Sequence, residues 1–260
     1  MEVDHRFIVQ RLMNLDVFYV LHTKTTHEPF VEYSEENLGD QIYIFEGQEE
    51  ATNLARVYAA RHYVIGVAEV KKEQYNSFFT SLFLIGADTV VFNCNGEDHV
   101  MKLDSFVKFN LPEEKPQDPP KKNDVLQLTM IYYLQEKRRV DMPADDPERK
   151  QKLDELEEEM WANVSESRFI LPLIPGPDAK SPDDVKKSKV YLVKTKDGQT
   201  FQPIFSDMWE CQKFFQKSNQ KMALAIMPFE ALKKGLVNEA KGYLVNPSST
   251  CLPILKAQLK

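Results

Sequence analysis

Residues 201–207 read FQPIFSD, and residues 40–47 read DQIYIFEG. Both stretches alternate apolar and polar residues up to a shared Ile-Phe pair, which predicts a short β-strand in each place. Acidic or small residues follow at once, and such residues are suited to cap the start of a helix. The two stretches therefore predict the same strand-to-helix transition twice in one chain.

The segments after each stretch agree in kind and in order. We expect a helix, an apolar strand, a second helix and a final strand, at residues 49–62, 63–70, 71–85 and 89–93 after the first stretch and at 208–219, 222–229, 230–240 and 242–247 after the second. The apolar runs predict strands that are buried on both faces. Gly86 and Gly242 are expected to end the second helices, because a helix stops most easily at glycine.

This order predicts an α+β fold, built as a tandem duplication of a small unit with a mixed β-sheet and packed helices. The first repeat would cover residues 1–110, a linker and connecting helix 111–146, and the second repeat 147–260. Two unrelated α/β domains that share a common order of elements are the alternative.

The connector between the repeats has its own signals. Four prolines within residues 111–122 predict an extended linker, followed by a helix over 125–139. Asp146-Pro147 predicts the start of another helix, whose acidic run at 155–159 we expect to face water; docking of a basic partner is the alternative. Farther on, Asp197-Gly198 predicts a type I′ hairpin turn.

The composition narrows the class of partner. The formal net charge is −7 and the isoelectric point is near 5.4, so phosphate backbones and acidic lipids would be repelled on average. No apolar run approaches the roughly 18 residues of a membrane span, and the acidic N-terminus differs from the basic start of a signal peptide. We therefore expect a cytoplasmic protein that binds neither nucleic acid nor membrane.

A search for catalytic and metal-binding motifs yields no strong candidate. The glycines form no phosphate-binding pattern, and the five histidines have no metal-ligand spacing. Cys94 lies in a plausible exposed turn five residues before His99, yet a reactive thiol also needs a lowered pKa. We therefore predict no catalytic residue, no metal and no cofactor, and a protein that is not an enzyme.

The second half of the chain resembles a known family. Its strands at residues 169–175 and 190–193, the Phe-Ser-Asp of residues 205–207 and the Val-Asn-Pro of residues 245–247 are similar to the SseB N-terminal domain family, a bacterial family named for enhanced serine sensitivity. The first half is a diverged version: Phe45-Glu46-Gly47 replaces Phe-Ser-Asp, and Phe92-Asn93-Cys94 lacks the proline. The resemblance implies a mixed α+β domain in a bacterial cytoplasmic protein and no defined reaction.

The family motif supplies the candidate contacts for a ligand or partner: Phe205, Asp207, Asn246 and Pro247, with Asn93 and Cys94 at the corresponding place in the first half. Each motif residue also has a structural explanation, namely core for Phe205, helix cap for Asp207 and a strand-ending turn for Asn246-Pro247.

Two functions remain open on these grounds. The first is a non-catalytic interaction or regulatory module built from two SseB-like repeats, whose partner is another protein or a second copy of the chain. The alternative is a small-molecule sensor or an enzyme with a site between the repeats or at the strand ends.

Overall fold

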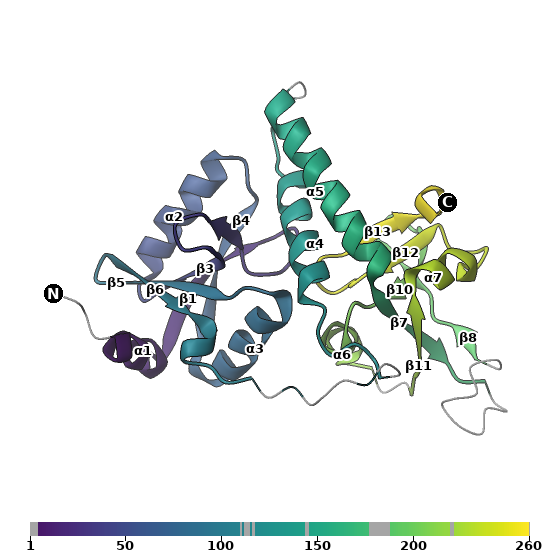
Figure 1. Cartoon of the computed structure of the whole chain (residues 1–260), viewed down its shortest axis with the longest axis horizontal. Coiled ribbons are helices and arrows are strands. Elements are labelled where there is room, and N and C mark those ends of the chain that lie inside the picture. Colours follow the sequence, from purple (N-terminus) through teal and green to yellow (C-terminus); the bar gives the residue numbers. More distant parts are fainter. Residues whose placement is uncertain are drawn as a thin grey trace. The chain divides into compact units, whose positions relative to one another are not determined.

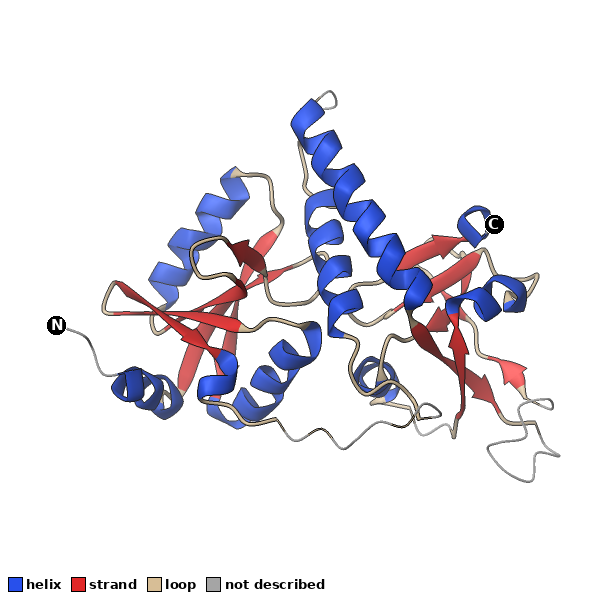
Figure 2. Cartoon of the chain, in the orientation of Figure 1, coloured by secondary structure: helices blue, strands red, loops and turns tan. Residues whose placement is uncertain are grey.

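The computed structural model describes residues 5–109, 111, 115, 118–143, 146–176, 188–218 and 221–259 (Figure 1). Helices and mixed sheets alternate along the chain, so the predicted α+β class is confirmed (Figure 2). The chain divides into two compact units, residues 1–110 with 127–157 and residues 111–126 with 158–260.

The first unit is one mixed sheet with helices on both faces. Its strands follow the order β4-β1-β3-β5-β6, and β2 pairs with the start of β3. Its elements are α1 (His5–Asn14), β1 (Val17–Thr23), β2 (Glu32–Ser34), β3 (Gly39–Phe45), α2 (Gln48–Ala60), β4 (Ile65–Lys71), α3 (Tyr75–Ile85), β5 (Thr89–Cys94) and β6 (Glu97–Lys102), with 3-10 turns at Lys72–Gln74 and Leu103–Ser105.

Alternation along the strands of this sheet builds two cores. On β3, Ile42 and Ile44 pack with residues of α1 and α3, whereas Tyr43 and Phe45 pack with residues of α2. Side chains of a strand point alternately to the two faces, so one short strand supplies both cores. Strand β3, which comes from the alternating stretch at residues 40–47, thus lies at the centre of the unit.

The second unit is built from shorter strands. Its sheets follow the orders β13-β12-β10-β9 and β11-β7-β8, and an antiparallel bridge between Ile170 and Phe205 joins them. Its elements are β7 (Arg168–Ile174), β8 (Lys189–Val190), β9 (Val193–Lys194), β10 (Thr200–Ile204), α6 (Met208–Phe215), β11 (Ala223–Pro228), α7 (Phe229–Gly235), β12 (Gly242–Val245), β13 (Leu252–Leu255) and a 3-10 turn at Lys256–Leu259.

The two units have the same strand pairings. In the first, β1 pairs antiparallel with β4 and β3, β3 pairs parallel with β5, and β5 pairs antiparallel with β6. In the second, β7 takes the place of β1, β11 of β4, β10 of β3, β12 of β5 and β13 of β6. Shared pairing is what a duplication requires; the duplication itself stays a prediction.

The apolar runs at 63–70 and 222–229 form strands, but the prediction that both faces are buried is wrong. They become β4 and β11, which lie at an edge of their sheets, and most of their side chains are half-buried. A continuous apolar run is also compatible with an edge strand whose faces are only partly covered. The closing strands β6 and β13 were not predicted, because charged residues in β6 and Pro253 in β13 obscure the strand pattern.

Two turn predictions need correction. The second helix of the second unit, α7, ends at Gly235 instead of near residue 240, and Gly242 is the first residue of β12. At the hairpin after β9 only Gly198 has a positive φ, at 79°, whereas a type I′ turn needs two such residues. Gly86 does end α3 in the left-handed conformation, as predicted.

Gly242 is required by packing, since an added Cβ would lie 2.1 Å from the backbone oxygen of Ile254. Backbone on β13 cannot give way cheaply, so we expect Gly242→Ala to lower the free energy of unfolding by about 2 kcal/mol. Gly235→Ala is the matched control, because its Cβ would make only ordinary contacts, the nearest at 3.6 Å. Equal urea midpoints for the two variants would contradict this explanation.

The structure divides the connector between the two units, whereas the sequence predicted a separate linker and connecting helix at residues 111–146. Helices α4 (Asp124–Lys137) and α5 (Pro147–Glu166) form the connector, and residues 127–157 group with the first unit. The reason is packing: Ile131 is fully buried in the first unit's core, with Leu128 and Tyr132 beside it. None of the described helices is long and apolar enough to cross a membrane.

Candidate functional site

The motif residues of the second unit meet where β10 and β12 end. The Asp207 side chain accepts a hydrogen bond from the Glu210 backbone N–H at 3.0 Å and so caps α6. Ser206 Oγ donates to Asp207 Oδ2 at 2.8 Å and accepts from Asn246 Nδ2 at 2.9 Å. The Asn246 Oδ1 atom accepts from the Ser206 backbone N–H at 3.0 Å. We call Ser206, Asp207, Glu210, Asn246 and Ser249 the strand-end cluster.

The cluster continues to the turn before β13. Ser249 Oγ donates to Glu210 Oε2 at 2.5 Å, and Lys213 Nζ lies 2.6 Å from Glu210 Oε1. Asn246 has a φ of 48°, a left-handed conformation that asparagine adopts more readily than most residues. Its carbonyl accepts from the backbone N–H groups of Ser249 and Cys251, each at 3.0 Å.

This arrangement confirms the structural explanations for the motif. Phe205 is fully buried in the core, Asp207 caps a helix, and Asn246 with half-buried Pro247 forms a strand-ending turn. Every member of the cluster is buried, with at most 1% of its surface exposed. Buried polar groups of this kind stabilise a structure when they satisfy one another. The strand-end cluster therefore joins two strands and a helix.

The first unit holds a different arrangement at the equivalent place. Arg11 on α1 donates to Glu46 Oε2 at 2.6 Å and to Asn95 Oδ1 at 2.9 Å, and Asn93 Nδ2 donates to Asp98 Oδ1 at 2.6 Å. An ion pair near the surface thus stands where the second unit has buried hydroxyl and amide groups. Asn93 in β5 and Asn246 just after β12 occupy equivalent positions in the two units.

The prediction of an exposed turn at Cys94 is wrong. This residue ends β5, is 3% exposed and belongs to the first unit's core, and burial raises the pKa of its thiol. Its cross-strand neighbour is Glu97, whereas His99 lies opposite Phe92. The structure therefore does not bring Cys94 and His99 together. Among the described residues, no group of three potential metal ligands is placed to hold an ion.

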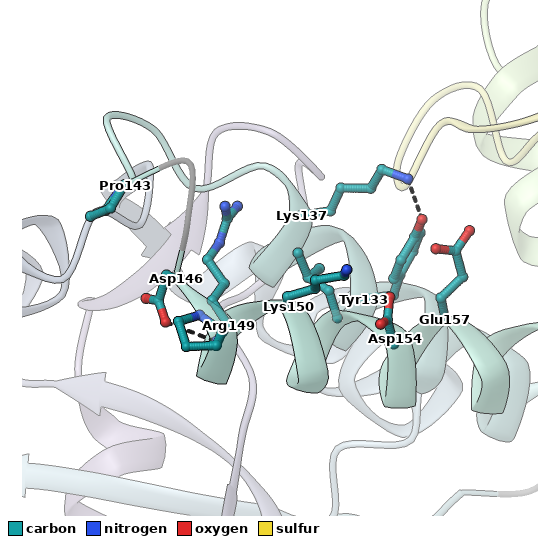
Figure 3. A pocket seen from close by; sticks show the side chains of 10 residues that line it. Tyr133, Lys137, Pro143, Asp146, Arg149, Lys150, Asp154 and Glu157 are labelled. Atoms are coloured by element: carbon teal, nitrogen blue, oxygen red, sulfur yellow. Dashed lines mark hydrogen bonds between the residues drawn. The ribbon is translucent and has the colours of Figure 1, made fainter.

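A second candidate site is a groove on the paired helices α4 and α5 in the first unit. It has a volume of about 570 Å³ and ten lining residues (Figure 3). Six of them are charged, whereas small-molecule pockets usually have only a few polar groups. The lining residues are Tyr133 and Lys137 of α4, Pro143 and Asp146 of the connecting loop, and Pro147, Arg149, Lys150, Leu153, Asp154 and Glu157 of α5. We call this the hairpin groove.

Helical spacing explains why these residues share one surface. Lys150, Asp154 and Glu157 recur at steps of three and four residues, so they form one stripe along α5. The stripe spans about 10 Å of helix, at 1.5 Å per residue. Within the described part of the chain, Lys150 and Asp154 form no ion pair, so the groove presents unpaired charges of both signs.

Tyr133 and Lys137 form the opposite wall. The Lys137 Nζ atom donates to the Tyr133 hydroxyl and lies 4.7 Å from the centre of the Tyr133 ring. Burial raises the pKa of Tyr133, and the hydroxyl stays a neutral hydrogen-bonding group. Figure 3 shows this pair beside Asp154 and Glu157.

A buried carboxylate holds the two helices of the groove together. Glu136 on α4 has 2% of its side chain exposed and lies 2.6 Å from Arg139, 3.4 Å from Lys152 and 3.6 Å from Arg149. The Tyr63 hydroxyl donates to it at 3.0 Å. Burial raises the pKa of Glu136, but these hydrogen bonds and positive charges outweigh it, so the pKa lies below its usual value. We call these residues the Glu136 cluster.

The hairpin groove was not predicted from the sequence. Asp146 was expected to cap α5, and it does accept the Arg149 backbone N–H at 3.1 Å. The acidic run at residues 155–159 of α5 was expected to face water, with docking of a basic partner as the alternative. A groove needs a second wall, and the sequence pattern of one helix does not reveal which other helix lies beside it.

Comparisons with known proteins add little. No known protein-family model matches the chain, and no curated protein matches it. Two solved structures align weakly: Tic22 from Plasmodium falciparum, at 13% identity and a TM-score of 0.22 over 97% of this chain and 93% of that one, and Anabaena Tic22 (protein transport), at 8% identity and a TM-score of 0.23 over 92% and 91%. Scores this low carry no argument about fold or function.

Proposed function

We propose that this chain is a non-catalytic interaction protein, and that the hairpin groove of its first unit binds a segment of a partner protein. The groove's lining carries the proposal, since unpaired Lys150 and Asp154 lie one helical turn apart on an accessible surface. Charges of both signs suit a protein segment with complementary charges, because electrostatic complementarity fixes the register of a partner.

A small-molecule site at the strand ends is less well supported than the hairpin groove. In the second unit the side chains of the strand-end cluster bond to one another, and in the first unit the Cys94 thiol is buried. A ligand at either place would have to replace existing hydrogen bonds, which costs free energy unless the ligand restores them.

We also propose that both units are SseB-like repeats of a bacterial cytoplasmic protein. The shared strand pairings support common descent, and the Phe-Ser-Asp and Val-Asn-Pro motifs of the second unit support the family. A duplicated scaffold leaves one copy free to diverge. On this view, the first unit has acquired the Arg11–Glu46 ion pair at the place where the second has the Ser206 hydroxyl.

The proposal is tested by charge reversal in the groove. We expect Lys137→Glu with Lys150→Glu to weaken capture of a stoichiometric partner from bacterial lysate at least about tenfold, because two attractive contacts become repulsive. Lys72→Glu with Lys108→Glu is the matched control, since both lysines are exposed, lie in the first unit outside the groove and change the net charge equally. Quantitative mass spectrometry of the captured proteins measures the effect.

Two results would contradict the proposal. One is the absence of any partner that wild type and control capture in stoichiometric amounts. The other is equal capture by the groove variant, which would place the contact elsewhere.

A further inference from the structure

The outer edges of the sheets differ in how well they are protected against pairing with another strand. An exposed edge offers unpaired N–H and C=O groups, and proteins usually blunt it with charges, proline or a short strand. Strand β6 has Glu97 and Lys102, β4 has Glu69, and β13 has Pro253. The strands β8 and β9 have only two residues each. Edge strand β11 ends in Pro228, but its first five residues, ALAIM, contain neither a charge nor a proline.

The neighbouring strand shows which backbone groups of β11 point outward. Ile170 on β7 exchanges two backbone hydrogen bonds with Phe205, at 2.8 and 3.0 Å, on the side away from β11. When two residues lie opposite each other in an antiparallel pair, their backbone N–H and C=O groups either all point toward the partner strand or all point away from it. Ile226 lies opposite Ile170, so its N–H and C=O point away from β7, and those of Leu224 do the same. In the described part of the chain, these groups have no other backbone partner.

We propose that β11 pairs with β11 of a second copy of this chain, antiparallel about a two-fold axis at Ala225. In this register Leu224 of each copy faces Ile226 of the other, and all four outward N–H groups of the two copies find a carbonyl. A shift of the axis to Ile226 would place Pro228 opposite Leu224 in the ladder, and proline has no N–H to donate. The strand is therefore complementary to itself in the register about Ala225, as a two-fold interface requires.

The charges beside β11 favour the same occupant. Lys221 precedes the strand and Glu230 follows it, and both are exposed. An antiparallel second copy brings Lys221 of one strand beside Glu230 of the other, which also pairs with Lys233 of its own chain at 2.6 Å, whereas a parallel copy would bring like charges together. The half-buried side chains of Leu224 and Ile226 would lose further solvent contact in the dimer. This interface lies in the second unit and does not depend on the hairpin groove.

The test compares two substitutions at one position. Analytical ultracentrifugation of the full chain should show a dimer of twice 30.2 kDa. We expect Ile226→Pro to raise the dissociation constant more than about tenfold, because it removes an outward N–H from each copy. Ile226→Ala truncates the side chain but keeps that N–H, and should remain closer to wild type. A monomeric wild type, or a dimer that Ile226→Pro leaves intact, would overturn the proposal.

Hydrogen exchange on the wild-type protein keeps the test decisive if Ile226→Pro does not fold. The amide of Ala225 points toward β7 and should be protected at every protein concentration. The amides of Leu224 and Ile226 should be protected in the dimer and exchange quickly after dilution to monomer. Fast exchange of both amides at high concentration would overturn the proposal.

Discussion

Replacing Asp207 with alanine should lower the free energy of unfolding by about 3 kcal/mol, from the lost helix cap and the unsatisfied partners left in the core. Asp207 caps α6 and accepts from Ser206 Oγ, and neither partner can reach water, because both lie in a cluster that is at most 1% exposed. The effect should also loosen Asn246, which bonds to the same serine. Urea denaturation followed by circular dichroism measures it.

A surface acidic residue gives the control for this prediction. Glu230 has 69% of its side chain exposed and pairs with Lys233 at 2.6 Å, so Glu230→Ala should change stability by less than about 0.5 kcal/mol. If Asp207→Ala costs no more than Glu230→Ala, the strand-end cluster does not stabilise the second unit, and a ligand-binding role for these residues would regain weight.

Replacing Glu136 with glutamine should also lower the free energy of unfolding strongly. Removing a buried carboxylate leaves Arg139 and Arg149 without their counter-charge in a mostly buried place, and breaking such a pair costs about 3 kcal/mol. Because the Glu136 cluster joins α4 to α5, the variant should also lose the groove-dependent partner. Thermal and urea unfolding measure the stability, and capture from lysate measures the binding.

The loss of stability in the Glu136→Gln variant should depend on pH in a definite direction. The folded-state pKa of Glu136 lies below the ordinary value of 4.5, so the carboxylate stabilises the folded protein above that pH. Its contribution disappears as the pH falls through the folded-state pKa. The stability difference between wild type and Glu136→Gln should therefore be full at pH 7 and shrink below about pH 4.5. A difference that grows on acidification would contradict the assigned charge state.

The sequence predicted those features that depend on local pattern. The Ile-Phe strands at residues 40–47 and 201–207, the Asp207 cap and the turn at Asn246 all have signals within a few residues, and the structure confirms them. The same signals were ambiguous about function, because an asparagine at a strand end can serve a turn or a ligand. The buried hydrogen-bond partners of Asn246 resolve that ambiguity, and such partners come from distant parts of the chain.

Features that depend on sheet order were beyond the sequence. The apolar runs of β4 and β11 could not show that they lie at edges, since burial of a strand depends on which neighbours pair with it. Cys94 looked exposed because Asn and Gly follow it, yet its side chain points into the core. The hairpin groove is formed by two helices together, and the charged residues of either helix alone have no unusual pattern in the sequence.

The central claim is that the hairpin groove contacts a partner protein, and photo-crosslinking in bacterial cells tests it most directly. A photoreactive residue placed at Asp154, inside the groove, should give one discrete adduct with another protein, and the same residue at Lys72, outside it, should not. The adduct at Asp154 should fade when Lys137→Glu and Lys150→Glu are added. No adduct at Asp154, or the same adduct from both positions, would contradict the claim.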